Sequence, residues 1–344
     1  MKQIVLAALL LAACSDDAKS DAEFAQDVAN AMHDSLQGDL ADLVQASKDL
    51  QAAAPTPSGR GWDATADAAA ISAMKAAWRR TRVAYEHIEG ALAPIFPDID
   101  VAIDFRYDDF LAGLGQEGDD DLFDDEGVTG MHAIERILYS NQIRDEVVRF
   151  ESTLPGYQPA RFPETAAEAM AMKTKLLQKL IDDTTTLQAQ WTPARVDIEA
   201  AFDGLVSLMN EQQEKVNKAA TGEEESRYAD MTLFDLRNNL EGTNKIYVLF
   251  SDWLKARSGG AAIDKNISDG MASLQTLYAT YTGDSVPEPP PTWSSDNPTP
   301  ADQQTPFGKL FIGVEDAVDP NRDGSVVSEM NQAATLLGFQ PFVE

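Results

Sequence analysis

Apolar side chains recur at helical spacing along most of this chain. The first run, within residues 22–54, contains Phe24, Val28, Met32, Leu36, Leu40, Leu43 and Leu50. Comparable runs cover about 64–93, a stretch from about 129 onward, and about 164–190, 194–220, 231–257, 262–282, 302–317 and 325–337. Such spacing is typical of the buried face of an amphipathic helix. No run of alternating β-branched residues is long enough to predict a strand, so the sequence predicts an all-α protein.

Two proline-rich segments separate the predicted helices. Residues 154–163 read LPGYQPARFP, and residues 285–302 read SVPEPPPTWSSDNPTPAD. Proline interrupts a helix because it lacks the backbone N–H and its ring clashes with the preceding turn. We place a domain boundary in the first segment. The prediction is therefore two tandem helical-bundle domains, over residues 22–155 and 160–344.

The N-terminus, MKQIVLAALLLAACSDD, resembles a bacterial lipoprotein signal. The apolar run over residues 4–13 has the length of a signal-peptide core and is too short to span a bilayer. Residues 11–14 (LAAC) match a lipobox, and Cys14 is the only cysteine, so no intrachain disulfide can form. We predict a signal peptide over residues 1–13, followed by a lipidated cysteine and tether over 14–21. A plain secretory signal with an incidental cysteine is the alternative.

The residue after the lipobox cysteine bears on location. Ser15, rather than aspartate, follows Cys14. By the sorting rule of Gram-negative bacteria, this favours the outer membrane. The predicted location is therefore the bacterial cell envelope, with a lipid anchor in the outer membrane and the protein facing the periplasm.

The net charge of the chain excludes some classes of binding partner. The formal net charge is −30 at pH 7, and 44% of residues are hydrophobic, which allows real cores beneath an acidic surface. Such a surface repels nucleic-acid phosphates and concentrates cations. We therefore expect no nucleic-acid partner. Solubility alone is an equally good explanation of the acidity.

An acidic segment comes just before the most specific local motif, GMHAIE at residues 130–135. Residues 119–126 read DDDLFDDE, in which Leu122 falls where a calcium loop would need a donor. This run is therefore interpreted as a solvated loop. The helix after it begins GMHAIE, and Gly130 there permits close approach of another chain or ligand. His132 and Glu135, three residues apart, lie on one flank of the helix and can bind one metal ion from the same side.

The preceding helix offers further candidates. Trp78, Arg82, Tyr85 and Glu89 share one stripe of the sequence AAWRRTRVAYEHIEGAL. A buried, unpaired charge on such a stripe costs several kcal/mol, so Arg82 and Glu89 need partners. Glu89 is a candidate third metal ligand, and Arg82 a residue that orients the ligands. The alternative is a buried ion pair that only holds the bundle together.

Other motifs are weaker or absent. The zinc-peptidase pattern His-Glu-x-x-His is missing, since His132 has no second histidine near it in sequence. Asp319, Asn321 and Asp323 occupy positions 1, 3 and 5 of an EF-hand-like loop, but position 12 is a methionine, so the closing bidentate ligand is missing or displaced. A weak calcium site and an Asx-rich turn are both compatible with this loop.

Several of these features together are similar to the imelysin-like family. They are the lipobox, the Trp78–Glu89 stripe, GMHAIE at residues 130–135, and ESRYADMTLFDLRNNLEGTNKIYV at residues 225–248. The family includes iron-regulated envelope proteins and proteins once described as insulin-cleaving metalloproteases. The resemblance implies two bundles related by duplication, a site that contains His132 and Glu135, and a role in bacterial iron acquisition with partner proteins.

Three functional hypotheses follow. The first is an envelope lipoprotein that binds iron or an iron-bearing ligand, since oxygen-rich and imidazole donors suit iron. Iron is the expected metal, ahead of zinc or calcium. The second is a metal-dependent peptidase. The third is a structural or interaction lipoprotein, whose polar cluster only joins the two bundles.

Overall fold

The computed structural model describes residues 19–56 and 58–343. The predicted signal peptide and Cys14 lie outside this part of the chain. Within the described ranges all regular structure is helical and no strand occurs, so the all-α prediction is confirmed. A search of the same residues finds no helix that combines the length and the apolar character needed to cross a membrane.

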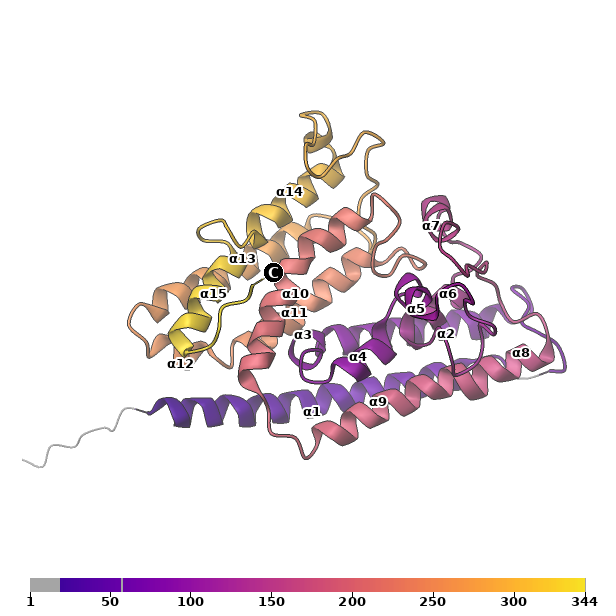
Figure 1. Ribbon diagram of the computed structural model, residues 1–344, viewed down its shortest axis with the longest axis horizontal. Coiled ribbons are helices and arrows are strands. Elements are labelled where there is room, and N and C mark those ends of the chain that lie inside the picture. Colours follow the sequence, from indigo (N-terminus) through magenta and orange to yellow (C-terminus); the bar gives the residue numbers. More distant parts are fainter. Residues whose placement is uncertain (1–18, 57, 344) are drawn as a thin grey trace, which may run out of the picture.

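The first bundle is organised around one long helix, α1 (Asp21–Ala53). It packs against α2 (Ala68–Glu86) and α9 (Leu177–Trp191), and α6 (Gly130–Leu138) packs against α2 and α9. Figure 1 shows α1 and α9 side by side along one long edge of the molecule. The predicted apolar stripe of α1 is buried here: Met32, Leu36, Leu40 and Leu43 are each 0% exposed.

The second bundle begins with α10 (Ile198–Lys218) and contains the helices that follow it. These are α11 (Thr232–Tyr247), α12 (Ser251–Lys255), α13 (Gly260–Ala279), α14 (Pro306–Val318) and α15 (Val326–Leu337), with a 3₁₀ turn at Asp302–Gln304. In Figure 1 they form a separate layer above α1 and α9. The proline-rich segment over residues 285–302 connects α13 to the 3₁₀ turn, as predicted.

The helices that follow the expected boundary pack on the first bundle. Helix α8 (Ala166–Ala171) continues through a π-helical turn, Met172–Leu176, into α9, and α9 contacts α1, α4 and α6. The packing therefore favours a division between the bundles at residues 192–197 rather than 155–160. The division into two domains, and their relation by duplication, stay predictions.

Four short helices occur along the chain between α2 and α8. They are α3 (Glu89–Leu92), α4 (Pro97–Asp104), α5 (Tyr107–Leu114) and α7 (Asp145–Glu151). No apolar run at helical spacing marks α4 in the sequence, which contains Pro97 there, a residue that would end a preceding helix. It instead occupies the first turn of α4, where its missing N–H costs nothing. The expected helix over 64–93 ends at Glu86, so Glu89 belongs to α3.

The bundles are in backbone contact at two glycines. A Cβ placed on Gly204 of α10 would lie 2.1 Å from the carbonyl oxygen of Gly90 in α3. A Cβ on Gly242 of α11 would lie 2.5 Å from Cα of His87. Because glycine alone allows these approaches, the end of α2 and helix α3 are held tightly against the second bundle.

Candidate metal centre

A close helix contact positions the histidine of the GMHAIE motif. Gly130 has φ of +81°, and a Cβ there would lie 2.6 Å from the carbonyl oxygen of Ile103. Only glycine fits both the left-handed backbone and this approach. The C-terminal end of α4 therefore rests on the first turn of α6. This contact places Asp104 beside His132.

His132 is fully buried and held from one side by Glu135. Its Nδ1 lies 2.7 Å from Oε2 of Glu135. The other oxygen of Glu135 accepts the backbone N–H groups of Tyr228 at 3.0 Å and Ala229 at 2.8 Å. A carboxylate at Nδ1 fixes the imidazole and leaves Nε2 for a metal, as in carboxylate–histidine–metal arrangements. Glu135 thus connects α6 to the loop that carries Glu225.

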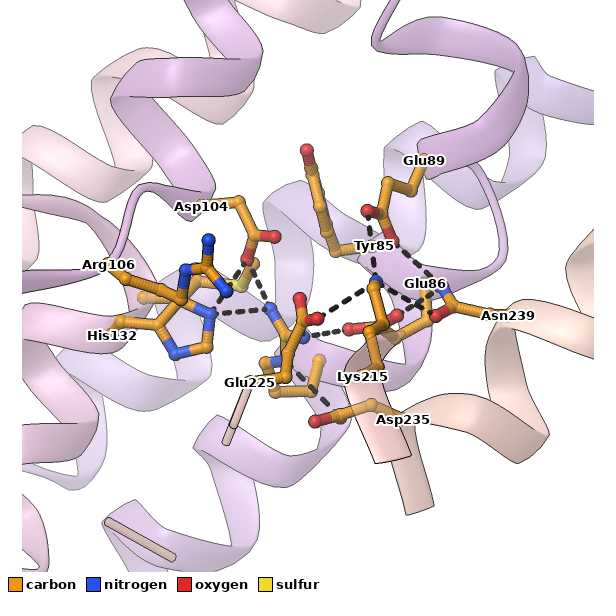
Figure 2. Close-up of polar contacts among 12 residues, drawn as sticks. Tyr85, Glu86, Glu89, Asp104, Arg106, His132, Lys215, Glu225, Asp235 and Asn239 are labelled. Atoms are coloured by element: carbon orange, nitrogen blue, oxygen red, sulfur yellow. Dashed lines mark hydrogen bonds and ion pairs between the residues drawn. The ribbon is translucent and has the colours of Figure 1, made fainter. Parts of the chain in front are cut away.

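Three side chains converge at the free nitrogen of the imidazole. Among the described residues, one ligand atom from each of Asp104, His132 and Glu225 lies within 4.8 Å of the others. Nε2 of His132 is 3.4 Å from Oδ1 of Asp104. Figure 2 shows these three side chains around a common point, with Arg106 close by. They come from α4, α6 and the loop between α10 and α11.

Arg82 supplies positive charge where the side chains of Asp104, His132 and Glu225 meet. It is 0% exposed and pairs with Glu86 and Asp104, and at 3.4 Å each with Glu225 and Asp235. Its Nη1 is 3.5 Å from Nε2 of His132. The guanidinium therefore occupies part of the space between the carboxylates, as a resident counter-cation.

Lys215 extends the same network along α10. Its ammonium lies 2.8 Å from Glu225 and 3.6 Å from Glu89, and it donates to Asn239 at 3.3 Å. Asn239 donates to Glu89 at 2.8 Å and also contacts Glu86. We call the carboxylates of Glu86, Glu89, Asp104, Glu225 and Asp235, with Arg82 and Lys215, the junction cluster. Five carboxylates there face two cations.

Burial changes the proton affinity of these groups. It raises the pKa of Asp104 well above the ordinary value, despite the opposing Arg82, and it raises the pKa of Asp235 to about 6. Burial would also raise the pKa of Glu225, but the Lys215 ammonium and the Arg82 guanidinium hold it well below the ordinary value. Burial lowers the pKa of His132, so its imidazole is neutral and can act as a ligand.

The two aromatic residues of the predicted stripe support the site. Trp78 is fully buried and donates its Nε1–H to the carbonyl of Met131 at 3.0 Å, which fixes α2 against α6. Tyr85 is also buried and donates its hydroxyl to Asp100 of α4. Burial raises the pKa of Asp100 to about 7, an effect that the Tyr85 hydroxyl partly offsets.

The convergence point opens into a pocket of about 390 Å³ between the bundles. Its lining includes seven carboxylates: Glu89, Asp100, Asp104, Asp109, Glu211, Glu214 and Glu225. One imidazole and two carboxylates form a donor set suited to a divalent or ferric ion. The surplus of carboxylates in the junction cluster favours an added cation, because each buried negative charge without a partner is costly.

The structure brings together only part of the predicted ligand set. His132 points into the pocket, whereas both oxygens of Glu135 are engaged on the other side of the imidazole. Glu89 lines the same pocket, but Lys215 lies between it and Glu225, as Figure 2 shows. Arg82 contacts Asp104, Glu225 and His132, yet its partner on the helix is Glu86 rather than Glu89.

Two members of the triad escaped sequence reasoning. Asp104 lies between the predicted helices over 64–93 and from about 129 onward, where no periodic run of apolar residues marks it. Glu225 is the first residue of the ESRYAD segment that carried the family resemblance. That resemblance was the available signal for Glu225, because the triad comes from three distant segments and has no local spacing.

The EF-hand-like loop near the C-terminus is built as a turn. Oδ1 of Asp319 accepts the backbone N–H of Asn321 at 2.8 Å, and Ser325 caps α15. The glutamate that could close the loop, Glu329, points to Asn266 of α13 at 3.2 Å. Asn321 and Asp323 are exposed. Calcium binding at Asp319, Asn321 and Asp323 stays a prediction.

The sequence is similar to that of known proteins. A family model described as Imelysin (Peptidase M75) matches residues 29–305. The chain is 28% identical over 288 residues to an Efem/EfeO family lipoprotein of Staphylococcus haemolyticus, covering 81% of this chain and 86% of the relative. It is 25% identical over 211 residues to the iron uptake system component EfeM of Pseudomonas syringae, covering 61% of this chain and 59% of that relative.

A solved structure agrees at the level of the fold. An imelysin-like protein from Psychrobacter arcticum superposes with a TM-score of 0.59 at 12% identity, over 95% of this chain and 99% of that one. At this identity the likeness concerns the fold alone. Since the family model covers most of the chain, including His132 and Glu225, the chain belongs to the imelysin family.

Proposed function

We propose that this protein is an envelope lipoprotein that binds iron for a bacterial iron-uptake system. Asp104, His132 and Glu225 are the proposed ligands, and Glu135 orients His132 from behind. The observation that carries the proposal is the convergence of these three ligand atoms within 4.8 Å. The names of the relatives, an Efem/EfeO family lipoprotein and an iron uptake system component, support iron as the cargo.

The charge of the junction cluster supports cation binding independently of the names. Arg82 and Lys215 neutralise only part of the negative charge there, and Asp104 is 12% exposed with its pKa raised. A bound ion would compensate the remaining carboxylates. Because carboxylic acids must lose their protons to bind a metal, iron binding is expected to strengthen as the pH rises.

A membrane anchor and partner proteins complete the proposal. The lipobox at residues 11–14 would place a lipid on Cys14. The predicted tether over residues 14–21 leads directly into α1, which begins at Asp21. We place the anchor in the outer membrane, with the bundles facing the periplasm, where other components of the uptake system would accept the iron.

The peptidase alternative needs a carboxylate that is free to activate water. Glu135 does not meet this need, because one of its oxygens contacts Nδ1 of His132 and the other accepts two backbone N–H groups. A peptidase would hydrolyse peptides continuously, and a chelator or the substitution His132→Ala would abolish that hydrolysis. Turnover with these two properties would replace the binding proposal.

The binding proposal is tested by anaerobic calorimetric titration of the purified protein with Fe²⁺, and with Fe³⁺ as a second arm. We expect one ion per chain for the wild type. His132→Ala and Asp104→Asn should each weaken binding at least about tenfold, because each removes a ligand.

His87→Gln is the matched control. His87 is a second histidine near the end of α2, and its side chain is 20% exposed and lies 4.0 Å from Glu241. Its replacement should leave iron binding unchanged. Equal binding by the His132 and His87 variants, with both proteins folded, would refute the proposed site.

A further inference from the structure

The pocket that opens from the metal ligands is unusually rich in carboxylates. Seven carboxylates and three cationic side chains line it among the described residues. The cations are Arg106, Lys215 and Lys218. A ligand that enters therefore meets a surplus of negative charge before it reaches His132.

Each lining cation already has a carboxylate partner inside the pocket. Arg106 pairs with Asp109 at 3.2 Å, and Lys218 with Glu214 at 2.6 Å. Lys215 pairs with Glu225 at 2.8 Å. An entering anion would have to break one of these pairs, and would leave the displaced carboxylate without its partner.

Other carboxylates in the pocket have only neutral hydrogen-bond donors. Asp100 accepts the hydroxyl of Tyr85, and Glu211 accepts the hydroxyl of Ser207 at 2.8 Å. A hydroxyl donor stabilises a carboxylate without cancelling its charge. Asp100 and Glu211 therefore contribute to a field that attracts cations and repels anions.

The pocket has room for a cation together with its water. At about 30 Å³ per water molecule, six waters of a hydrated ion occupy roughly 180 Å³. The pocket holds about 390 Å³. Three protein ligands would replace part of the hydration shell, and the remaining waters can donate hydrogen bonds to the surrounding carboxylates.

We infer that the pocket takes iron as a free, partly hydrated cation and excludes iron carried by an anionic chelator such as a polycarboxylate. This inference rests on the proposed function, since it concerns the form in which iron reaches Asp104, His132 and Glu225. It assigns specificity to carboxylates that do not touch the metal, among them Asp100 and Glu211.

The test is equilibrium dialysis of the purified full-length protein against Fe²⁺ and radiolabelled citrate. The experiment is anaerobic, at physiological salt and at about pH 8, where Asp100 is ionised. Citrate is raised stepwise while total iron is fixed. We expect iron occupancy to follow the free Fe²⁺ concentration, with no accumulation of label on the protein side. Label retained in proportion to iron, or iron bound only when citrate is present, would overturn the inference and leave iron binding itself intact.

A pair of variants tests the role of the carboxylates. Glu211→Gln should weaken Fe²⁺ binding about threefold or more, since it removes a nearby negative charge without removing a ligand. Glu241→Gln removes the same charge from a side chain that is 69% exposed and does not line the pocket, and should change nothing. Equal affinities for both variants would contradict the inference. Failure of the wild type to bind iron in either form would overturn the proposed function as well.

Discussion

The protein has two strongly acidic regions, and they are built in different ways. In the acidic loop, residues 119–126, the exposed carboxylates Asp120, Asp125 and Glu126 face solvent. In the junction cluster, five carboxylates are enclosed with Arg82 and Lys215 between the two bundles. The loop is conspicuous in the sequence, whereas the cluster is assembled from helices and loops far apart along the chain. The number of charges in a segment therefore says less about chemistry than their burial does.

The loop is held by its apolar residues and by local turns. Phe123 is fully buried, and Leu122 is nearly so. Asp121 accepts the N–H of Phe123 at 3.1 Å, and Asp124 accepts that of Glu126 at 2.9 Å, as in Asx turns. Asp119 is the exception to the expected solvated loop: it is 4% exposed, and burial raises its pKa to about 6.

Replacing Arg82 should cause the largest loss of stability, because Arg82 lies in the junction cluster. Arg82→Met leaves four carboxylates around a neutral side chain, and breaking a buried ion-pair network in this way costs about 3–5 kcal/mol. Urea denaturation without metal would measure the loss. Arg80→Met on the same helix is the control, because Arg80 is 56% exposed and should lose less than about 1 kcal/mol. Similar losses for both variants would mean that the cluster is not buried as described.

A smaller but specific effect is expected at Gly130. In Gly130→Ala the new Cβ meets the carbonyl of Ile103 in a left-handed backbone. We expect a loss of about 2 kcal/mol and weaker iron binding, because α4 and Asp104 must move. Gly113→Ala in α5 has open space around its Cβ and should be neutral or stabilising. If the Gly130 variant kept full stability and iron affinity, the contact between α4 and α6 would not position the site.

The buried carboxylates also predict how stability depends on pH. Burial raises the pKa of Asp100 from 3.8 to about 7, so the folded state retains a proton that the unfolded state releases. The contribution of Asp100 to the free energy of unfolding without metal should therefore fall as the pH rises, by about 2 kcal/mol between about pH 5.5 and 8. Asp100→Asn should reduce this slope. The exposed Asp98 on the same helix is the control, and Asp98→Asn should leave the slope as it is.

The smallest effects are expected in the acidic loop. Neutralising Asp120, Asp125 and Glu126 together, as Asn, Asn and Gln, should change stability by no more than about 0.5 kcal/mol. If the loop draws cations in, the association rate for Fe²⁺ should fall at low salt, and this difference should vanish at high salt. Stopped-flow measurements would show it. An equal loss in rate and in affinity would assign the loop a direct role in binding.

The sequence predicted the long helices well. The apolar periodicity of α1 and of the helices after residue 164 survives in the structure because each has one buried face. Arg82 has the charge partners that its position on the stripe required, whereas the metal-binding role of His132 stays a prediction. These features depend on local spacing, which a single sequence contains.

The rest of the site depends on long-range packing. Glu89 looked like a helix-mate of Arg82, but α2 ends at Glu86 and the chain turns before α3. Asp104 reaches His132 only because α4 ends against Gly130, and Glu225 arrives on a loop that Glu135 holds by its backbone. These contacts join segments that are far apart along the chain, so the spacing of residues within one segment cannot predict them.

The most direct test of the central claim is a crystal structure of the protein soaked anaerobically with Fe²⁺, measured at the iron absorption edge. The account predicts one anomalous peak in the junction, with His132 Nε2 and carboxylate oxygens of Asp104 and Glu225 at about 2.0–2.3 Å. A peak held by the acidic loop, or one in the junction that His132 does not touch, would contradict it.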